Sequence, residues 1–119
     1  MGYDITFRAK LEGIDKYVTV GDCEANITYN VREIITLSTG LPWINCENNG
    51  FCKDVIPHIK KGLEELVSHP EKYKPYEAEN GWGTVEGTVR FFRDILKAWD
   101  RLGLHEGTEL ANVATFWIT

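Results

Sequence analysis

Residues 85 to 102 contain the pattern that most constrains the fold of this chain. Apolar side chains recur there at steps of three and four, which places them on one face of an α-helix. We therefore predict a long amphipathic helix that ends at Gly103. The rest of the chain has to bury this face in a core. The residues on the face are Val85, Val89, Phe91, Phe92, Ile95, Leu96, Trp99 and Leu102.

Two further segments show the helical repeat. The first begins near Val31, with Asn30 as the expected N-cap and Gly40 as the stop. In the second, Pro57 is expected in the first turn, because an interior proline would cost about 3 kcal/mol. The apolar residues of this second helix are Val55, Ile56, Ile59, Leu63, Leu66 and Val67.

Alternating apolar and polar residues predict strands at the start of the chain. Residues 3–11 alternate as expected of a half-buried strand, and residues 16–20 follow a turn and form its partner. Gly21 and Asp22 are expected to end this hairpin. Residues 112–119 have the β-branched and aromatic content of a further strand.

The order of these elements predicts an α+β fold. A small antiparallel sheet would consist of the N-terminal hairpin and the C-terminal strand, with three helices packed on one face. Residues 41–50 and 71–79 are expected to connect the helices as loops. A chain of 119 residues fits a single domain covering residues 1–119.

The charge balance excludes one class of function. With 13 basic and 18 acidic residues, the net charge is −5, so we expect no general nucleic-acid binding. No apolar run approaches the roughly 20 residues that a membrane span needs, and we expect no secretory signal in the first residues. The three cysteines form no dense framework, so we expect reduced thiols and a cytoplasmic location.

The segment from 80 to 88, Asn-Gly-Trp-Gly-Thr-Val-Glu-Gly-Thr, is the strongest candidate for a ligand site. Trp82 could stack on a flat ring, while Thr84 and the amides at the helix start hold phosphate oxygens. Gly83 would allow close approach of the backbone, and Asn80 adds an amide. The same pattern is typical of a tight turn whose indole closes the core. It matches neither a Rossmann fingerprint nor a P-loop.

Four more residues are candidates for ligand binding. Arg90 begins a basic stripe on the long helix, and guanidinium groups suit phosphate. The acidic residues interspersed with it equally fit a salt-bridged surface. Tyr29 and Asn30 offer a ring and an amide, although a core tyrosine and a helix cap would use the same residues. Tyr76 lies shortly before the turn. The stripe continues through Arg93, Lys97 and Arg101.

The sequence gives little support for catalysis. Cys46, Cys52 and His58 match no usual zinc spacing, so we expect no metal site. No motif for a nucleophile or a metalloprotease is present, and no cofactor is expected. A small nucleotide hydrolase that uses Glu77 or His105 as acid or base stays open as an alternative.

Three segments are distinctive when taken together: residues 3–5 (Tyr-Asp-Ile), residues 26–30 (Asn-Ile-Thr-Tyr-Asn) and residues 76–88, which include the Gly-Trp-Gly turn. With them the chain resembles a family of small uncharacterised proteins from bacteriophages, prophages and gut bacteria. The resemblance spans nearly the whole chain and brings no established chemistry. It implies a context, because small phage proteins often counter bacterial immunity by sequestering nucleotide second messengers or by gripping a defence protein.

We therefore expect a non-catalytic homo-oligomer that binds a nucleotide-derived small molecule. Its role would be phage counter-defence, the sequestration of an immune second messenger in the host bacterial cytoplasm. A protein-binding inhibitor or adaptor of a host defence protein is the alternative, with Trp43 and Trp117 as interface anchors. The expected ligand-binding residues are Tyr29, Asn30, Tyr76, Asn80, Trp82, Gly83, Thr84 and Arg90.

Overall fold

The computed structural model describes most of the chain as strands and helices around one core. The described residues are 2–10, 16–28, 31–41, 47–77, 81, 83–102 and 112–118. In chain order the elements are β1 (Gly2–Lys10), β2 (Tyr17–Thr28), α1 (Arg32–Thr39), β3 (Glu47–Phe51), α2 (Cys52–Ser68), α3 (Pro70–Tyr73), the 3₁₀ helix η2 (Lys74–Tyr76), α4 (Val85–Arg101) and β4 (Thr115–Ile118).

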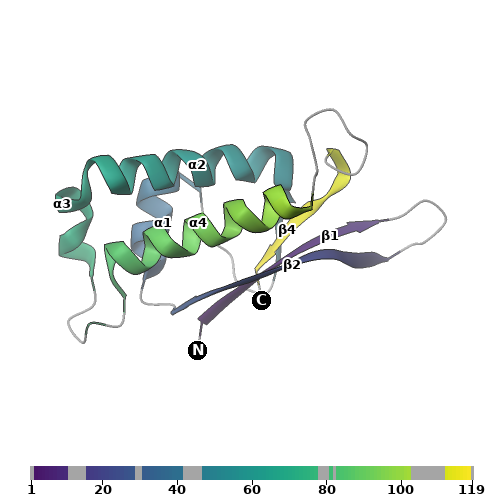
Figure 1. Ribbon diagram of the computed structural model, residues 1–119, viewed down its shortest axis with the longest axis horizontal. Helices are drawn as coiled ribbons and strands as arrows, with labels where there is room; N and C mark the ends of the chain where they lie inside the picture. Colours follow the sequence, from purple (N-terminus) through teal and green to yellow (C-terminus); the bar gives the residue numbers. More distant parts are fainter. Residues whose placement is uncertain are drawn as a thin grey trace.

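The strands form one antiparallel sheet in the order β2-β1-β4-β3. The helices lie together on one side of it, with α2 and α4 packed against each other and α4 packed on β2 (Figure 1). The predicted α+β fold, with a small antiparallel sheet and helices on one face, is confirmed. The short helix α3 is an addition to the three helices that the sequence predicts.

The core lies between the sheet and the helices. Alternate residues of β1 point into it, among them Phe7, whose ring meets Trp99 of α4 at 5.4 Å and Phe116 of β4 at 6.1 Å. The predicted apolar face of α4 is confirmed, since Phe91, Phe92 and Ile95 are buried there. The edges of that face are only partly buried, namely Val89, Leu96, Trp99 and Leu102.

Two details of the predicted helices are wrong. Pro57 lies inside α2, in its second turn, because the helix begins at the buried Cys52 directly after β3. The backbone N–H of Cys52 donates to the carbonyl of Ala114, which ties the start of the helix to the end of the chain. Val67 is 54% exposed, so it lies outside the core face of α2.

The ends of α1 follow the sequence more closely. Gly40 adopts a left-handed conformation (φ 75°) after the last turn, and its N–H donates to the carbonyl of Thr36. The prediction of a glycine stop is confirmed. The N-cap position falls on Val31 instead of Asn30, a shift of one residue that is common at helix ends.

The extents of two strands differ from the prediction: β4 is shorter than residues 112–119, whereas β2 is longer than residues 16–20. The opening hairpin is confirmed, but β2 does not end at Gly21-Asp22; it continues to Thr28, with two register shifts against β1. Such bulges let a strand pass residues that break strict alternation. The expected loop at 41–50 contains most of β3, a polar edge strand paired with β4. The expected connection at 71–79 contains most of α3 and all of η2.

Candidate functional site at the start of helix α4

The structure describes half of the residues that the sequence analysis expects to bind a ligand. Tyr29, Asn30, Asn80 and Trp82 lie outside the described residues, so the stacking role of the indole stays a prediction. The described candidates all lie in or near the first turns of α4 or in η2. They are Tyr76, Gly83, Thr84 and Arg90.

Thr84 is the N-cap of α4. Its backbone is extended (φ −116°, ψ 158°), and its Oγ1 accepts a 2.9 Å hydrogen bond from the N–H of Gly87. Its carbonyl oxygen accepts bonds from both the N–H and the hydroxyl of Thr88. Gly83, immediately before it, is buried. Gly83 and Thr84 therefore directly precede the first turn of the helix, and Thr84 caps it.

Glu77 reaches the same helix start from the end of η2. Its Oε2 accepts a 3.2 Å hydrogen bond from the N–H of Val85, the first residue of α4. A helix start carries partial positive charge, so a carboxylate is stabilised there. The Glu77 carboxylate therefore occupies part of the helix start at which the sequence predicts a bound anion, and binding of a ligand there stays a prediction. Glu77 is also one of the two residues that the hydrolase alternative would use as acid or base.

A groove of about 390 Å³ opens beside this helix start. We call it the α4 groove. It lies where the last turn of α2, the α3–η2 segment and the first turns of α4 meet, which Figure 1 shows at one end of the helical layer. Its lining combines an apolar group, Leu66, Val67, Pro70, Val85 and Val89, with a polar group, Lys74, Glu77, Thr84 and Glu86.

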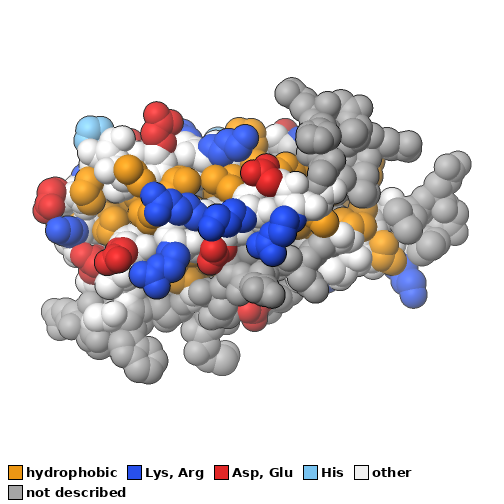
Figure 2. All heavy atoms as spheres, viewed as in Figure 1, with side chains coloured by type: hydrophobic (Ala, Val, Ile, Leu, Met, Phe, Trp, Pro, Cys, Tyr) orange, Lys and Arg blue, Asp and Glu red, His pale blue; other side chains and the backbone are white. Residues whose placement is uncertain are grey.

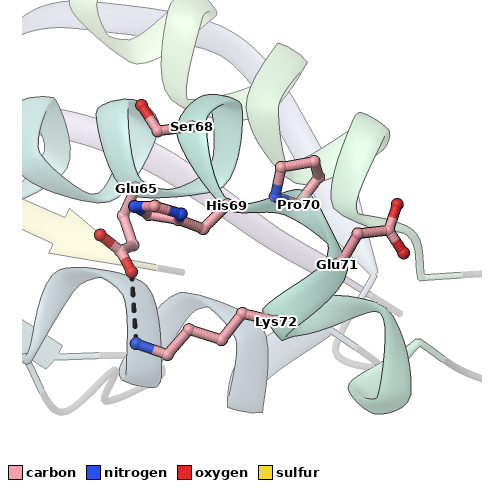
Figure 3. Close-up of a pocket in the computed structure, with 6 residues that line it drawn as sticks. All are labelled: Glu65, Ser68, His69, Pro70, Glu71 and Lys72. Atoms are coloured by element: carbon pink, nitrogen blue, oxygen red, sulfur yellow. Dashed lines mark hydrogen bonds and ion pairs between the residues drawn. The ribbon is translucent and has the colours of Figure 1, made fainter.

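A buried tyrosine holds the α3–η2 segment against α2. The hydroxyl of Tyr73 donates to Oε1 of Glu65 at 2.9 Å, and Nζ of Lys72 lies 3.3 Å from the same oxygen. Figure 3 shows Glu65 and Lys72 reaching toward each other across a shallow hollow that His69 and Pro70 also line. These contacts fix the segment from which Lys74 and Glu77 reach the α4 groove.

The same contacts shift the titration of the groups involved. The hydrogen bond from Tyr73, followed by that from Lys72, lowers the pKa of Glu65. Burial, followed by the hydrogen bond to Glu65, raises the pKa of Tyr73. The hydrogen bond to Glu65 raises the pKa of Lys72. All three directions favour the hydrogen-bonded arrangement with an ionised Glu65, a neutral Tyr73 and a charged Lys72.

The cationic candidates lie on the outer surface of α4. Arg90 pairs with Glu86 at 3.5 Å, one turn away, and the two side chains are 73% and 85% exposed. Such exposed pairs contribute little to stability, so Arg90 can exchange this partner for another anion at small cost. Figure 2 shows basic side chains gathered over the helices on this face, with acidic ones among them. The other basic residues of the stripe are exposed too, namely Arg93, Lys97 and Arg101.

The residues considered for catalysis or metal binding have other surroundings. Cys52 is buried, and burial raises the pKa of its thiol to about 12, which leaves it a poor nucleophile. Nδ1 of His58 lies 3.1 Å from the carbonyl oxygen of Thr39. Cys46 and His105 lie outside the described residues. Within the described part of the chain, no group of three or more His, Cys, Asp or Glu residues is placed to hold a metal ion.

None of the helices in the described part is both long and apolar enough to cross a membrane. Comparison with the models of known protein families, with curated proteins and with solved structures finds no match to this chain. The fold alone therefore classifies this protein: it is an α+β protein whose antiparallel sheet is covered by helices on one face.

Sequence reasoning missed the groove partners contributed by the α3–η2 segment. Lys74 fell in the stretch 71–79 that was expected to be a polar connection, and Pro70 directly precedes that stretch. One signal was available, because a proline directly after a helix end often occupies the first turn of the next helix, as Pro70 does in α3. No local signal indicates that Leu66 and Val67 lie beside the start of α4, since that proximity is a tertiary contact.

Proposed function

We propose that this protein is a non-catalytic binder of a nucleotide-derived small molecule, which it holds in the α4 groove. One observation carries the proposal: the groove combines an apolar floor, a lysine and the start of a long helix within one hollow. A flat ring needs the first of these features, and a phosphate needs the other two.

The lining suggests how such a ligand would lie. The ring would rest on Val85, Val89 and Leu66, and a phosphate would approach Lys74 and the first amides of α4. There it would take the place of the Glu77 carboxylate, which already accepts the N–H of Val85. In this arrangement the carboxylate closes the empty site and swings out when a stronger anion arrives.

Two candidates from the sequence neighbour residues that line the groove. Tyr76 is 41% exposed in η2, one residue before Glu77, and can close over a ring. Arg90 pairs with Glu86, which itself lines the groove, and in this exposed pair a phosphate can replace the carboxylate. Their participation, and that of Trp82 and Asn80, is part of the proposal.

The polar side chains of the groove support binding without catalysis. Thr84 already accepts a hydrogen bond from Gly87, and Nζ of Lys74 pairs with Glu71 at 3.1 Å. Among the described residues that line the groove, the bases are two carboxylates. Glu77 caps the start of α4 and Glu86 pairs with Arg90, and no other base of this lining lies beside Thr84 or Lys74. An activated nucleophile requires such a base or a lowered pKa.

The biological setting of the proposal comes from the resemblance in sequence. A phage or prophage protein that binds a nucleotide second messenger without destroying it would act as a sponge in the host cytoplasm and blunt an immune signal. A sponge works stoichiometrically, so it has to be abundant and bind tightly. We also propose that it is a homo-oligomer, in which exposed apolar side chains outside the groove such as Leu37 become covered.

A protein-binding inhibitor is the second candidate, and a specific observation favours it. Val67 and Tyr76 are 54% and 41% exposed, and Val67 lines the α4 groove. A partner protein could insert an apolar side chain there. This alternative predicts that Arg90→Glu or Trp43→Ala abolishes capture of a host protein, while no small ligand raises the melting temperature.

Native mass spectrometry of the protein purified from a bacterial lysate tests the proposal. We expect an oligomer that carries a small molecule whose mass fits a nucleotide derivative, and loss of that mass from Lys74→Glu. Lys97→Glu is the matched control, because it makes the same charge change on an exposed residue outside the groove lining. A bare mass, together with no change in melting when nucleotide derivatives are added, would contradict the proposal.

A further inference from the structure

The face of the sheet that points away from the helices carries a cluster of rings and cations. We call Arg8, Lys10, Tyr17, Thr115 and Trp117 the sheet-face cluster. The guanidinium carbon of Arg8 lies 4.6 Å from the centre of the Trp117 ring, and Nζ of Lys10 lies 5.2 Å from that of Tyr17. The two rings meet edge to face at 5.2 Å and 64°.

Hydrogen bonds fix the polar ends of this cluster. Nε1 of Trp117 donates to Oγ1 of Thr115 at 2.8 Å, and that hydroxyl donates to the carbonyl of Arg8 at 2.6 Å. Nε of Arg8 donates to Oγ1 of Thr6 at 3.0 Å, on the same strand. The indole and the guanidinium are therefore held in place before any ligand arrives, which reduces the entropy lost on binding.

The core does not account for this cluster. The opposite sides of the same strands bury Phe7 and Phe116, whereas Tyr17 is 38% exposed and Trp117 only partly buried. The register confirms the division, since Thr6 pairs with Trp117 and Lys10 with Tyr17 on the outer face. No helix of the described part of the chain packs on this face (Figure 1).

We propose that the sheet-face cluster binds single-stranded nucleic acid. Unpaired bases would stack on Tyr17 and on the indole–guanidinium pair, and phosphates would pair with Arg8, Lys10 and the neighbouring Lys16. One exposed and one partly buried ring, interleaved with cations on the outer face of an antiparallel sheet, form the kind of platform on which single strands stack. A duplex hides the faces of its bases and would gain only the few charge contacts.

The acidic net charge limits the interaction but does not oppose it. A general nucleic-acid binder needs a broad basic surface, which a chain of net charge −5 does not have. Stacking needs only a local platform, so the footprint is short, the affinity modest and the salt dependence shallow. This inference is independent of the proposed function, since the α4 groove belongs to the helical layer and the cluster to the outer face of the sheet.

Fluorescence anisotropy of a labelled oligothymidylate and of the same length of oligouridylate, at low salt, tests the inference. We expect saturable binding that Tyr17→Ala and Lys10→Glu each weaken, by about tenfold for the lost ring. Tyr17→Phe keeps a ring and should keep the binding, which separates stacking from a folding defect. A duplex of the same length should compete poorly.

Matched controls come from the helical layer. Leu37→Ala removes a large exposed side chain of α1, and Lys97→Glu reverses an exposed lysine of α4. Both should leave oligonucleotide binding unchanged. Absence of binding by the wild type, equal loss in the controls, equal affinity for the duplex, or capture of a protein by this face without any oligonucleotide binding would each overturn the inference. Loss of nucleotide binding in Lys74→Glu would concern only the groove.

Discussion

The Glu77 carboxylate accepts the backbone N–H of Val85 at 3.2 Å, so a side chain from the end of η2 caps the first residue of α4. This contact connects the end of η2 with the start of α4, two segments that the sequence patterns do not place together. It also marks where an anion is stabilised at the helix start. The proposed ligand would bind at this position, where its phosphate would compete with the Glu77 carboxylate.

Glu77→Gln should lower stability and strengthen ligand binding. The amide keeps a hydrogen-bond acceptor but loses the charge, which costs about 0.3–1 kcal/mol at a helix start. Chemical denaturation measures this loss. A phosphate would no longer have to displace a carboxylate, so the affinity for an anionic nucleotide should rise severalfold. Weaker binding of the ligand by this variant would show that Glu77 contacts the ligand favourably.

Thr84→Ala should destabilise the protein by about 0.5–2 kcal/mol, because it leaves the N–H of Gly87 without the Oγ1 acceptor. Thr84→Ser keeps that oxygen and should lie close to the wild type. Urea denaturation of the three proteins gives the comparison. If alanine and serine behave alike, the hydroxyl does not cap the helix.

Gly62→Ala should destabilise the packing of α1, α2 and α4. A Cβ at this position would lie 2.7 Å from Cγ2 of Thr39 and 3.1 Å from Cε2 of Phe92. Overpacking of this kind costs about 1–3 kcal/mol, more than the gain in helix propensity of about 1 kcal/mol. Lys61→Ala, at an exposed site of the same helix, is the control for thermal melting. A melting temperature above that of the wild type would contradict the observed proximity of the helices.

Stability should fall at both ends of the pH range through the contacts of Tyr73. The pKa of Glu65 is lowered from 4.5, so its stabilising contribution is present above that pH and is lost as the pH falls through the lower folded value. The pKa of Tyr73 is raised from 10.0, so its contribution is present below that pH and is lost as the pH rises through the folded value. Denaturation midpoints measured across pH should show both limbs.

Two variants separate these limbs. Glu65→Gln should flatten the acid limb below pH 4.5, since no carboxylate then has to be protonated. Tyr73→Phe should remove the tyrosine contribution to the alkaline limb, although Lys72, whose pKa is also raised, still titrates there. An unchanged acid limb in Glu65→Gln would assign the acid sensitivity to other carboxylates.

The fold could be predicted where local patterns carry the information. The spacing from Val85 to Leu102 predicts α4, and strict alternation predicts β1. The sequence Glu-Asn-Asn-Gly-Phe has no such alternation, so β3 is recognised only by its pairing with β4. The extension of β2 beyond Gly21 depends in the same way on its pairing with β1 across bulges.

The site could be predicted only in part. The motif around Thr84 indicates a helix start, and the structure confirms that start. The groove depends on Leu66, Lys74 and Glu77, which reach Thr84 only through the folding of the α3–η2 segment. The sheet-face cluster likewise requires the register that brings Arg8 beside Trp117.

Isothermal titration calorimetry with cyclic dinucleotides and ADP-ribose derivatives tests the central claim most directly. We predict saturable heat with at least one of these ligands and no turnover of it. Lys74→Glu should weaken the binding by about tenfold or more, because a hydrogen bond to a charged group contributes about 1.5–3 kcal/mol. Lys97→Glu should bind as the wild type does. Absence of heat with every ligand, or equal binding by Lys74→Glu and Lys97→Glu, would contradict the claim.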